Sequence, residues 1–293
     1  MSAHAKGVLI TALGVLFISP DTLLIRLAGM DIWSLAVWRG VLQALGVLLL
    51  VAAVYRGRTW TAFRAIGWSG LLLAAVFAAN TLAFLAAVLN TKVANALVLV
   101  ATAPLFTALL SWLILGERLA LRTWAAILAA LAGVALIVAE GLGAGTLLGD
   151  GMALLAAFLL GFKFTIVRRR RSIDMVPAMA ASGLMFAAAA LPFAEAAAPA
   201  PEQLLWLVLM GFAVLAPATA LLTIGPRYLP APEVSLMMLG ETVLGPLWVW
   251  LAIHEAPSPL GLAGGAVVLA ALSANAVLGL RRRTPALPPL THP

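Results

Sequence analysis

The sequence predicts an all-α integral membrane protein of ten transmembrane helices, and three observations indicate this class. Hydrophobic residues make up 64% of the 293 residues and charged residues 10%, whereas soluble globular chains hold roughly 45–50% and about 25%. Apolar runs recur along the chain, each long enough to cross a bilayer, which takes about 20 residues. These runs do not alternate polar and apolar residues as the strands of an outer-membrane barrel would. The composition therefore excludes a water-soluble enzyme and an intrinsically disordered protein.

The expected spans follow from the positions of the charged residues. Charge-free intervals contain the third, fourth, fifth, seventh, eighth and tenth spans, and the other four spans carry internal charges. The first span follows Lys6 as a signal peptide would, but its apolar run is too long and nine spans follow, so we interpret it as a retained helix. The ten spans are expected at residues 7–28, 32–54, 66–87, 93–115, 122–139, 148–166, 175–195, 203–225, 233–252 and 259–279.

The distribution of Lys and Arg predicts the orientation. With the N-terminus in the cytoplasm, fourteen of the 18 basic residues lie in inner segments, two lie on the outer side and two lie inside spans. This positive-inside pattern places both termini in the cytoplasm, as expected of a multi-pass protein of the bacterial inner membrane. It also accounts for the net charge of +7 without a nucleic-acid partner. The run Arg168–Arg171 is expected to anchor the topology, with a lipid or regulatory site as the alternative.

No sequence motif indicates catalysis, a metal or a cofactor. The chain has no cysteine, which excludes disulfides and a thiol nucleophile, and its three histidines (His4, His254 and His292) are scattered. The sequence contains no nucleophile elbow, zinc-binding HExxH helix or Walker A loop. We therefore expect no enzyme activity, no metal and no cofactor; the expected partners are the lipid bilayer and a small-molecule substrate.

Two halves of the chain repeat each other. At an offset of 138 residues Trp68 aligns with Trp206 and Glu117 with Glu255, and nearer the start of each half the offset becomes 142 to 143. Each half holds five helices, and an odd number inverts the second copy in the membrane. Inverted repeats are typical of alternating-access transporters with a substrate site near the midplane. We expect one five-helix repeat at 1–144, an inverted five-helix repeat at 145–280 and a disordered cytoplasmic tail at 281–293.

One stretch of the first half resembles a known family. APLFTA at residues 103–108 runs on to LGER at 115–118 and to Gly133-Val134, and Arg39 lies in the second span. These features resemble the EamA repeat of the drug/metabolite transporter superfamily, over about residues 7–280 and more weakly in the second half. The resemblance implies a ten-helix exporter of small metabolites. Members of this superfamily export amino acids, drugs and nucleobases, and the ten-helix members include exporters of aromatic and other neutral amino acids.

Four ionisable residues lie well inside the spans: Asp21, Arg39, Lys163 and Glu241. Each is unfavourable in a bilayer unless it is paired or faces water, so each marks a candidate functional site. Counting about 1.5 Å per residue along straight helices places Asp21 and Arg39 in the outer half and the other two in the inner half. We expect an outer ion pair Asp21–Arg39 and an inner pair Lys163–Glu241, either as permanent packing contacts or as parts of a gate or substrate site. Asp21 and Lys163 are equivalent in the repeat but opposite in charge, which suits an amphoteric substrate.

Polar, aromatic and Met side chains near the middle of the spans are expected to complete a substrate cavity. They lie either in the middle of the third span or one helical turn from an intramembrane carboxylate, and core packing is the alternative for each. The substrate-binding candidates are Phe17, Asp21, Phe77, Asn80, Phe84, Lys163, Met237, Met238 and Glu241.

Proline and small residues predict where helices break and pack. Pro20 is expected either to interrupt the first span, as in the discontinuous helices of transporters, or only to kink it. The fifth span has small residues at every fourth position up to Gly133, and the tenth span has Gly261 and Gly265. Such residues allow close helix contact. We expect packing within the chain, with a homodimer through the fifth and tenth spans as the alternative.

The function that these features predict is secondary transport. The favoured prediction is export of small metabolites, with amino acids as the favoured class, by alternating access around a cavity between the two repeats. Proton coupling through Asp21 or Glu241 and facilitated diffusion are both left open. The alternatives are an exporter of drugs or nucleobases with the same fold, a lipid flippase and a channel.

Overall fold

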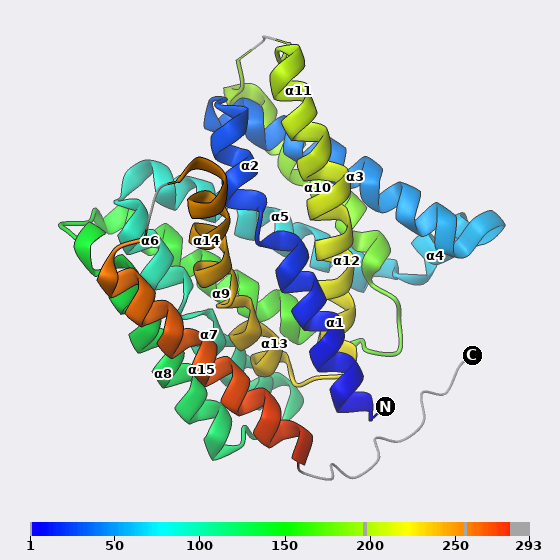
Figure 1. The fold of residues 1–293 in the computed structure, drawn as a ribbon. Helices are drawn as coiled ribbons and strands as arrows, with labels where there is room; N and C mark the ends of the chain where they lie inside the picture. Colours follow the sequence, from blue (N-terminus) through cyan, green and yellow to red (C-terminus); the bar gives the residue numbers. More distant parts are fainter. Residues whose placement is uncertain (1, 196–197, 255–256, 282–293) are drawn as a thin grey trace.

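The computed structural model describes residues 2–195, 198–254 and 257–281, and its regular structure there is entirely helical (Figure 1). Ten segments of this part of the chain are long and apolar enough to cross a membrane. They begin and end close to the predicted spans, so the predicted all-α membrane fold is confirmed. Glu255 and residues 282–293 of the predicted tail lie outside the described residues.

The helices of the first five spans are α1 (Ala3–Ile18), α2 (Asp21–Ala28), α3 (Ile32–Tyr55), α4 (Thr59–Ala65), α5 (Gly67–Asn90), α6 (Val93–Val100), α7 (Ala103–Leu110) and α8 (Leu121–Val138). Those of the last five are α9 (Leu147–Arg169), α10 (Val176–Ala190), α11 (Pro201–Val208), α12 (Ala216–Ile224), α13 (Ala231–Met238), α14 (Glu241–Ile253) and α15 (Pro259–Arg281). Short 3-10 turns lie at η1 (Arg56–Arg58), η3 (Ala139–Gly141), η4 (Leu191–Phe193) and η6 (Gly225–Arg227), and π-helical turns at η2 (Ser111–Leu115) and η5 (Leu209–Leu215).

The second span differs from the prediction at its end. The helix α3 begins at a cap in which Asp31 Oδ1 accepts hydrogen bonds from the backbone N–H groups of Trp33 and Ser34. It ends at Tyr55. The next residue, Arg56, turns the chain with a φ of 50°, and the short helix α4 follows beyond the predicted end of the span. Figure 1 shows α4 projecting at the edge of the bundle.

Three spans are discontinuous. The first breaks between α1 and α2 at Ser19-Pro20, where proline removes a backbone donor. The fourth breaks between α6 and α7 at Ala101-Thr102, and the ninth breaks between α13 and α14 at Leu239-Gly240. The last two breaks lie 138 residues apart. The same offset separates Gly116 (φ 68°) and His254 (φ 59°), two residues that end a helix in the left-handed backbone conformation. The offset seen in the sequence therefore reappears in the backbone.

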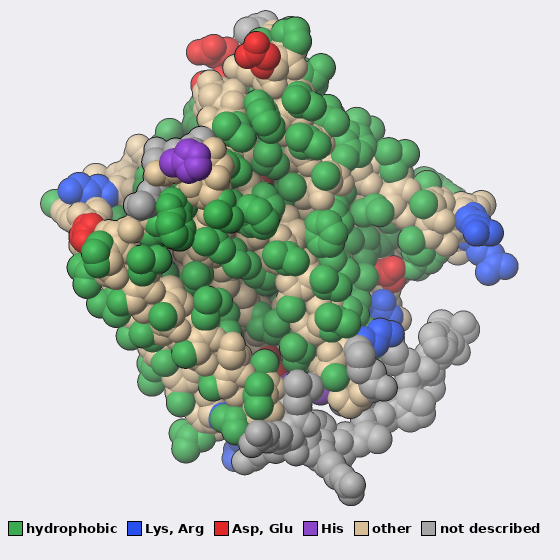
Figure 2. All heavy atoms as spheres, viewed as in Figure 1, with side chains coloured by type: hydrophobic (Ala, Val, Ile, Leu, Met, Phe, Trp, Pro, Cys, Tyr) green, Lys and Arg blue, Asp and Glu red, His purple; other side chains and the backbone are tan. Residues whose placement is uncertain are grey.

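Glycine pairs set two close helix contacts. A Cβ atom on Gly40 would lie 2.5 Å from the carbonyl oxygen of Gly183, so α3 and α10 touch backbone to backbone. A Cβ atom on Gly133 would lie 2.8 Å from the carbonyl oxygen of Gly264, which joins α8 to α15, the pair that runs side by side in Figure 1. Gly133 is thus used within the chain. Figure 2 shows hydrophobic side chains covering the visible face, with charged groups gathered at its margins, as a bilayer requires.

Candidate functional site

A central cavity of about 530 Å³ lies among both halves of the chain. Side chains from α2, α3, α5, α9 and α14 line it, together with the break between α6 and α7. Of the predicted site residues, those that line the cavity are Asp21, Arg39, Phe77, Asn80, Phe84, Lys163, Met238 and Glu241. The cavity therefore brings together all four intramembrane charges.

Two predicted site residues do not line the cavity. Phe17 on α1 is 41% exposed at the surface of the protein. Met237 packs in an apolar cluster around Phe164. Both were chosen because they lie one helical turn before a carboxylate. The breaks at Ser19-Pro20 and Leu239-Gly240 fall inside these turns and end the helical spacing. Phe17 and Met237 lie outside the cavity, whereas Met238, which was chosen for the same spacing, lines it.

Asp21 and Arg39 form an ion pair across the cavity wall. Arg39 Nη2 donates to Asp21 Oδ2 at 2.6 Å, and the side chains are 23% and 7% exposed. Asp21 Oδ1 is buried and has no hydrogen-bond partner among the described residues. One turn after Arg39, Gln43 Nε2 donates to the backbone oxygen of Met179 at 3.3 Å and ties α3 to α10.

Lys163 does not pair with Glu241. The Lys163 ammonium lies over the Phe77 ring, 3.6 Å from its centroid, and 5.3 Å from the centroid of Phe164. These are cation–π contacts. In the part of the chain that the structure describes, no carboxylate lies within ion-pair distance of Lys163. The predicted inner pair is therefore wrong.

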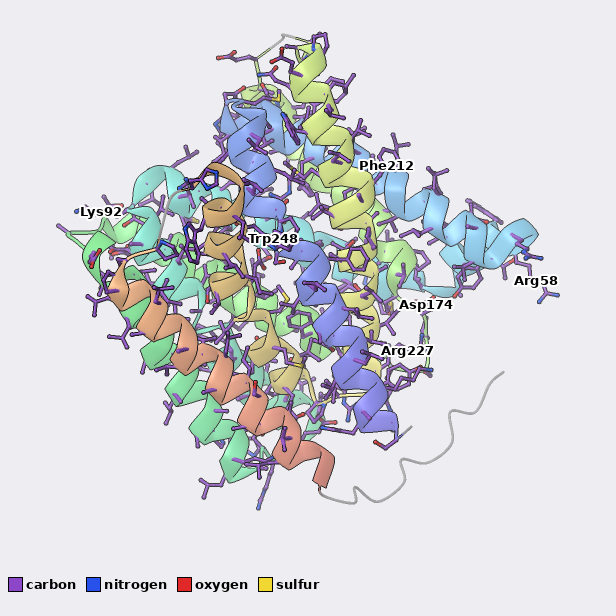
Figure 3. The ribbon with its side chains drawn as sticks, viewed as in Figure 1. Arg58, Lys92, Asp174, Phe212, Arg227 and Trp248 are labelled. Atoms are coloured by element: carbon purple, nitrogen blue, oxygen red, sulfur yellow. The ribbon has the colours of Figure 1, made fainter. Side chains whose placement is uncertain are left out.

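Glu241 instead lines the same cavity as the Asp21–Arg39 pair. The break before Gly240 makes Glu241 the first residue of α14, and α14 packs on α2. Trp248 Nε1 donates to Ser19 Oγ at 2.8 Å and fixes this contact, and Figure 3 shows Trp248 on α14. Depth counted along one straight helix could not represent this bend.

Several polar residues of the cavity were missed in the sequence, among them Gln43 and Ser235. Gln43 lies four residues after Arg39, and this i,i+4 spacing alone would have placed it on the same face of α3. Ser235 is 1% exposed, lines the cavity and has a buried hydroxyl without a partner. Nothing in the sequence distinguishes Ser235 from a packing residue. Asn80 was predicted, and part of its hydrogen-bonding capacity is already used within the protein, because its Nδ2 donates to the Ala156 backbone oxygen at 2.7 Å.

The cavity extends toward one end of the bundle, which we call the outer end. Its lining includes Ile32, Val93 and Val138, which are the first residues of α3 and α6 and the last residue of α8. The N-terminus lies at the opposite, inner end, beyond the lining residues. The cavity is therefore asymmetric along the predicted membrane normal.

Ion pairs join the helices at the inner end. Glu233 on α13 contacts Arg122 of α8 at 3.4 Å and His4 of α1 at 3.8 Å. Arg122 also donates to the Leu278 backbone oxygen on α15 at 2.8 Å. The Glu233 carboxylate thus links three spans, and Arg122 connects them to a fourth.

A second inner contact involves the first residue of the basic run Arg168–Arg171. Arg168 is 8% exposed, donates from Nε to Glu117 at 2.9 Å and from Nη1 to the Pro226 backbone oxygen at 3.3 Å. Arg168 therefore packs inside the inner end.

In the described part of the chain, ten apolar helices surround a central cavity that holds four ionisable side chains, which is the architecture of a multi-pass membrane protein. Residues 5–139 match the EamA-like transporter family. This part of the chain is therefore an EamA-like transporter domain of the drug/metabolite transporter superfamily, and the resemblance noted above is confirmed. No curated protein sequence matches the chain.

A crystal structure of a protein is similar to this one in fold. Its TM-score is 0.83 at 19% sequence identity, and the match covers 96% of this chain and 99% of the other. At that identity the likeness shows the shared fold of the whole chain, including the half that the family match does not reach.

Proposed function

We propose that the protein exports amino acids or closely related amphoteric metabolites across a bacterial inner membrane. The observation that carries this proposal is the charge arrangement of the cavity. Arg39 neutralises Asp21, whereas Lys163 and Glu241 have no ion-pair partner among the described side chains. A cavity with one unpaired cation and one unpaired carboxylate suits a ligand that carries both charges.

A zwitterion satisfies the cavity with few groups. Its carboxylate would accept hydrogen bonds from the Lys163 ammonium, and its ammonium would donate to Glu241 and to the unpartnered Asp21 Oδ1. Phe77 and Phe84 offer apolar surface for a side chain. The volume of about 530 Å³ falls within the range of roughly 300–1,000 Å³ that is usual for small-molecule sites.

Alternating access would move this site between the two sides of the membrane. The arrangement described above corresponds to an outward-facing state, in which the cavity reaches the outer end and the Glu233 and Arg168 contacts hold the inner end together. The breaks in the fourth and ninth spans, 138 residues apart, support two inverted five-helix repeats at 1–144 and 145–280. Broken helices at the cavity give each repeat a place to bend.

Uptake into liposomes tests the proposal. Purified protein should take up a subset of labelled amino acids saturably, and unlabelled members of that subset should compete. Lys163→Gln should abolish most of this uptake, whereas Lys92→Gln, the same change at an exposed position outside the cavity, should not. If no amino acid is taken up above empty liposomes, while a drug or nucleobase is, the proposed substrate class is wrong. A pH gradient across the same liposomes separates proton coupling from facilitated diffusion.

A further inference from the structure

A second cavity opens on the flank of the bundle, between α14 and α15. Its volume is about 430 Å³, and its lining is almost wholly apolar. Pro246 and Trp250 line it from α14, Gly261 and Leu262 from α15, and Ile137 from α8. This groove lies in the half of the bundle near the outer end.

Small side chains create the groove. A Cβ atom on Gly265 would lie 3.1 Å from Val243 Cγ1, so α14 and α15 touch at that level. One turn nearer the outer end, a Cβ atom on Gly261 would meet only its own neighbours, Ser258 at 3.4 Å and Pro257 at 3.7 Å. The two helices therefore diverge toward the outer end, and no side chain of the described residues fills the space between them.

The groove faces hydrocarbon. Its rim carries large exposed apolar side chains, with Trp250 39%, Leu262 55% and Leu269 44% exposed. In a span of a membrane protein, such exposure means contact with lipid chains. A bilayer leaves no empty space beside them.

Few polar groups line the groove. Two hydroxyls line it, and both are already engaged: Thr242 Oγ1 donates to the Leu239 backbone oxygen at 2.7 Å, and Ser258 Oγ accepts from the Gly261 N–H at 3.1 Å. A polar solute would find only the Trp250 indole N–H and the Ser258 hydroxyl as donors there, whereas a hydrocarbon chain needs no partner. The chemistry of the lining thus selects an acyl chain.

The groove also adjoins the central cavity. Ile137, Thr242 and Pro246 line both spaces, so at this place one layer of side chains separates the substrate site from the bilayer. Thr242 directly follows Glu241 in α14. We propose that an acyl chain of an outer-leaflet phospholipid binds in this groove and completes the cavity wall between α14 and α15. This lipid site does not depend on the identity of the transported substrate.

Photo-crosslinking tests the proposal on the whole chain. The protein is placed in nanodiscs of a phospholipid that carries a diazirine within its acyl chain, irradiated and mapped by peptide mass spectrometry. Crosslinks are expected at Ile137, Thr242 or Pro246, and also at Leu128, a lipid-facing residue of α8 that is 60% exposed and lies outside the groove. Thr81 lines only the central cavity and should carry none.

Filling the groove provides the matched control. Gly261→Trp and Ala266→Phe each place a ring in the groove, and either should lower the groove crosslinks about tenfold while the Leu128 crosslink stays unchanged. A variant is taken as folded when its Leu128 crosslink and its elution profile match those of the unmodified protein. Two filled variants are made so that the test stands even if one of them does not fold. Crosslinks at Leu128 without any in the groove, groove crosslinks that a folded filled variant does not reduce, or crosslinks at Thr81 would overturn the proposal.

Discussion

Glu233→Gln should open the inner end of the molecule. The Glu233 carboxylate contacts both Arg122 and His4 and so joins α13, α8 and α1. A glutamine keeps the size of the side chain but removes the charge, which leaves the Arg122 guanidinium without its carboxylate partner. The hydrogen bond from Arg122 to Leu278 remains, so the helices themselves should stay folded.

The size of the effect follows from burial. The side chains of Glu233, Arg122 and His4 are 8%, 19% and 12% exposed. Removing one partner of a fully buried pair destabilises by about 3–5 kcal/mol, and an exposed pair contributes about 0–1 kcal/mol, so we expect about 1.5–3 kcal/mol here. Because this free energy stabilises only the closed inner end, the ratio of inner-closed to inner-open molecules should fall about 10- to 150-fold.

Cysteine accessibility measures this ratio. The chain has no cysteine, so Ser235→Cys introduces a single thiol at a position that is 1% exposed and lines the cavity. In inside-out vesicles, a charged thiol reagent should label Ser235→Cys slowly and should label the Glu233→Gln double variant faster by the factor given above. Glu202→Gln, the same change at an exposed position, is the control. Equal labelling rates with and without Glu233 would refute a role for this residue in closing the inner end.

Three further changes test other contacts. Asp21→Asn should lower stability by about 1–3 kcal/mol, because it removes the ion-pair partner of Arg39, whose side chain is 23% exposed, and adding Arg39→Gln should restore part of the loss in a thermal unfolding assay in detergent. Gly40→Val should prevent the contact of α3 with α10, since its Cβ atom would lie 2.5 Å from a backbone oxygen, and normal yield and elution would contradict this. Trp248→Phe should lower stability by about 0.5–1.5 kcal/mol through loss of the Ser19 hydrogen bond, and Trp250→Phe, on a more exposed face, should have a smaller effect.

The sequence was sufficient for the spans and for the four ionisable residues of the cavity. Apolar runs between charges place helices well, because the bilayer forces every backbone polar group into helical hydrogen bonds. The cost of an ionisable group in hydrocarbon identified Asp21, Arg39, Lys163 and Glu241, and all four line the cavity.

The partners of these charges could not be predicted in the same way. Depth along a straight helix separated Glu241 from Asp21, whereas the break at Leu239-Gly240 brings α14 against α2. Helical spacing across the breaks also did not distinguish Phe17 and Met237, which lie outside the cavity, from Met238, which lines it. In the sequence, Pro20 indicates the break in the first span. Gly240 hardly indicates the break in the ninth span, because glycine is common in membrane helices.

Contacts between segments that are distant in the sequence could not be predicted either. Arg168 lies in a run of four arginines that resembles any topology anchor. Its partners, Glu117 and the Pro226 backbone, are 51 and 58 residues away in sequence. Only the packed structure separates this buried arginine from its neighbours.

The central claim is that Lys163 binds the carboxylate and Glu241 the ammonium of one substrate, and matched ligands test it directly. Competition with labelled phenylalanine compares unlabelled phenylalanine, phenethylamine, which lacks the carboxylate, and 3-phenylpropionate, which lacks the ammonium. Hydrogen bonds to charged groups contribute about 1.5–3 kcal/mol, so each deletion in the ligand should weaken competition about 10- to 150-fold in the unmodified protein.

The two variants should respond in opposite ways. Lys163→Gln should weaken competition by phenylalanine by the same factor but leave competition by phenethylamine unchanged. Glu241→Gln should weaken competition by phenylalanine but leave competition by 3-phenylpropionate unchanged. Such non-additivity marks a direct contact between the two deleted groups. If instead each variant weakens all three ligands equally, Lys163 and Glu241 do not bind these groups and the account of the site is wrong.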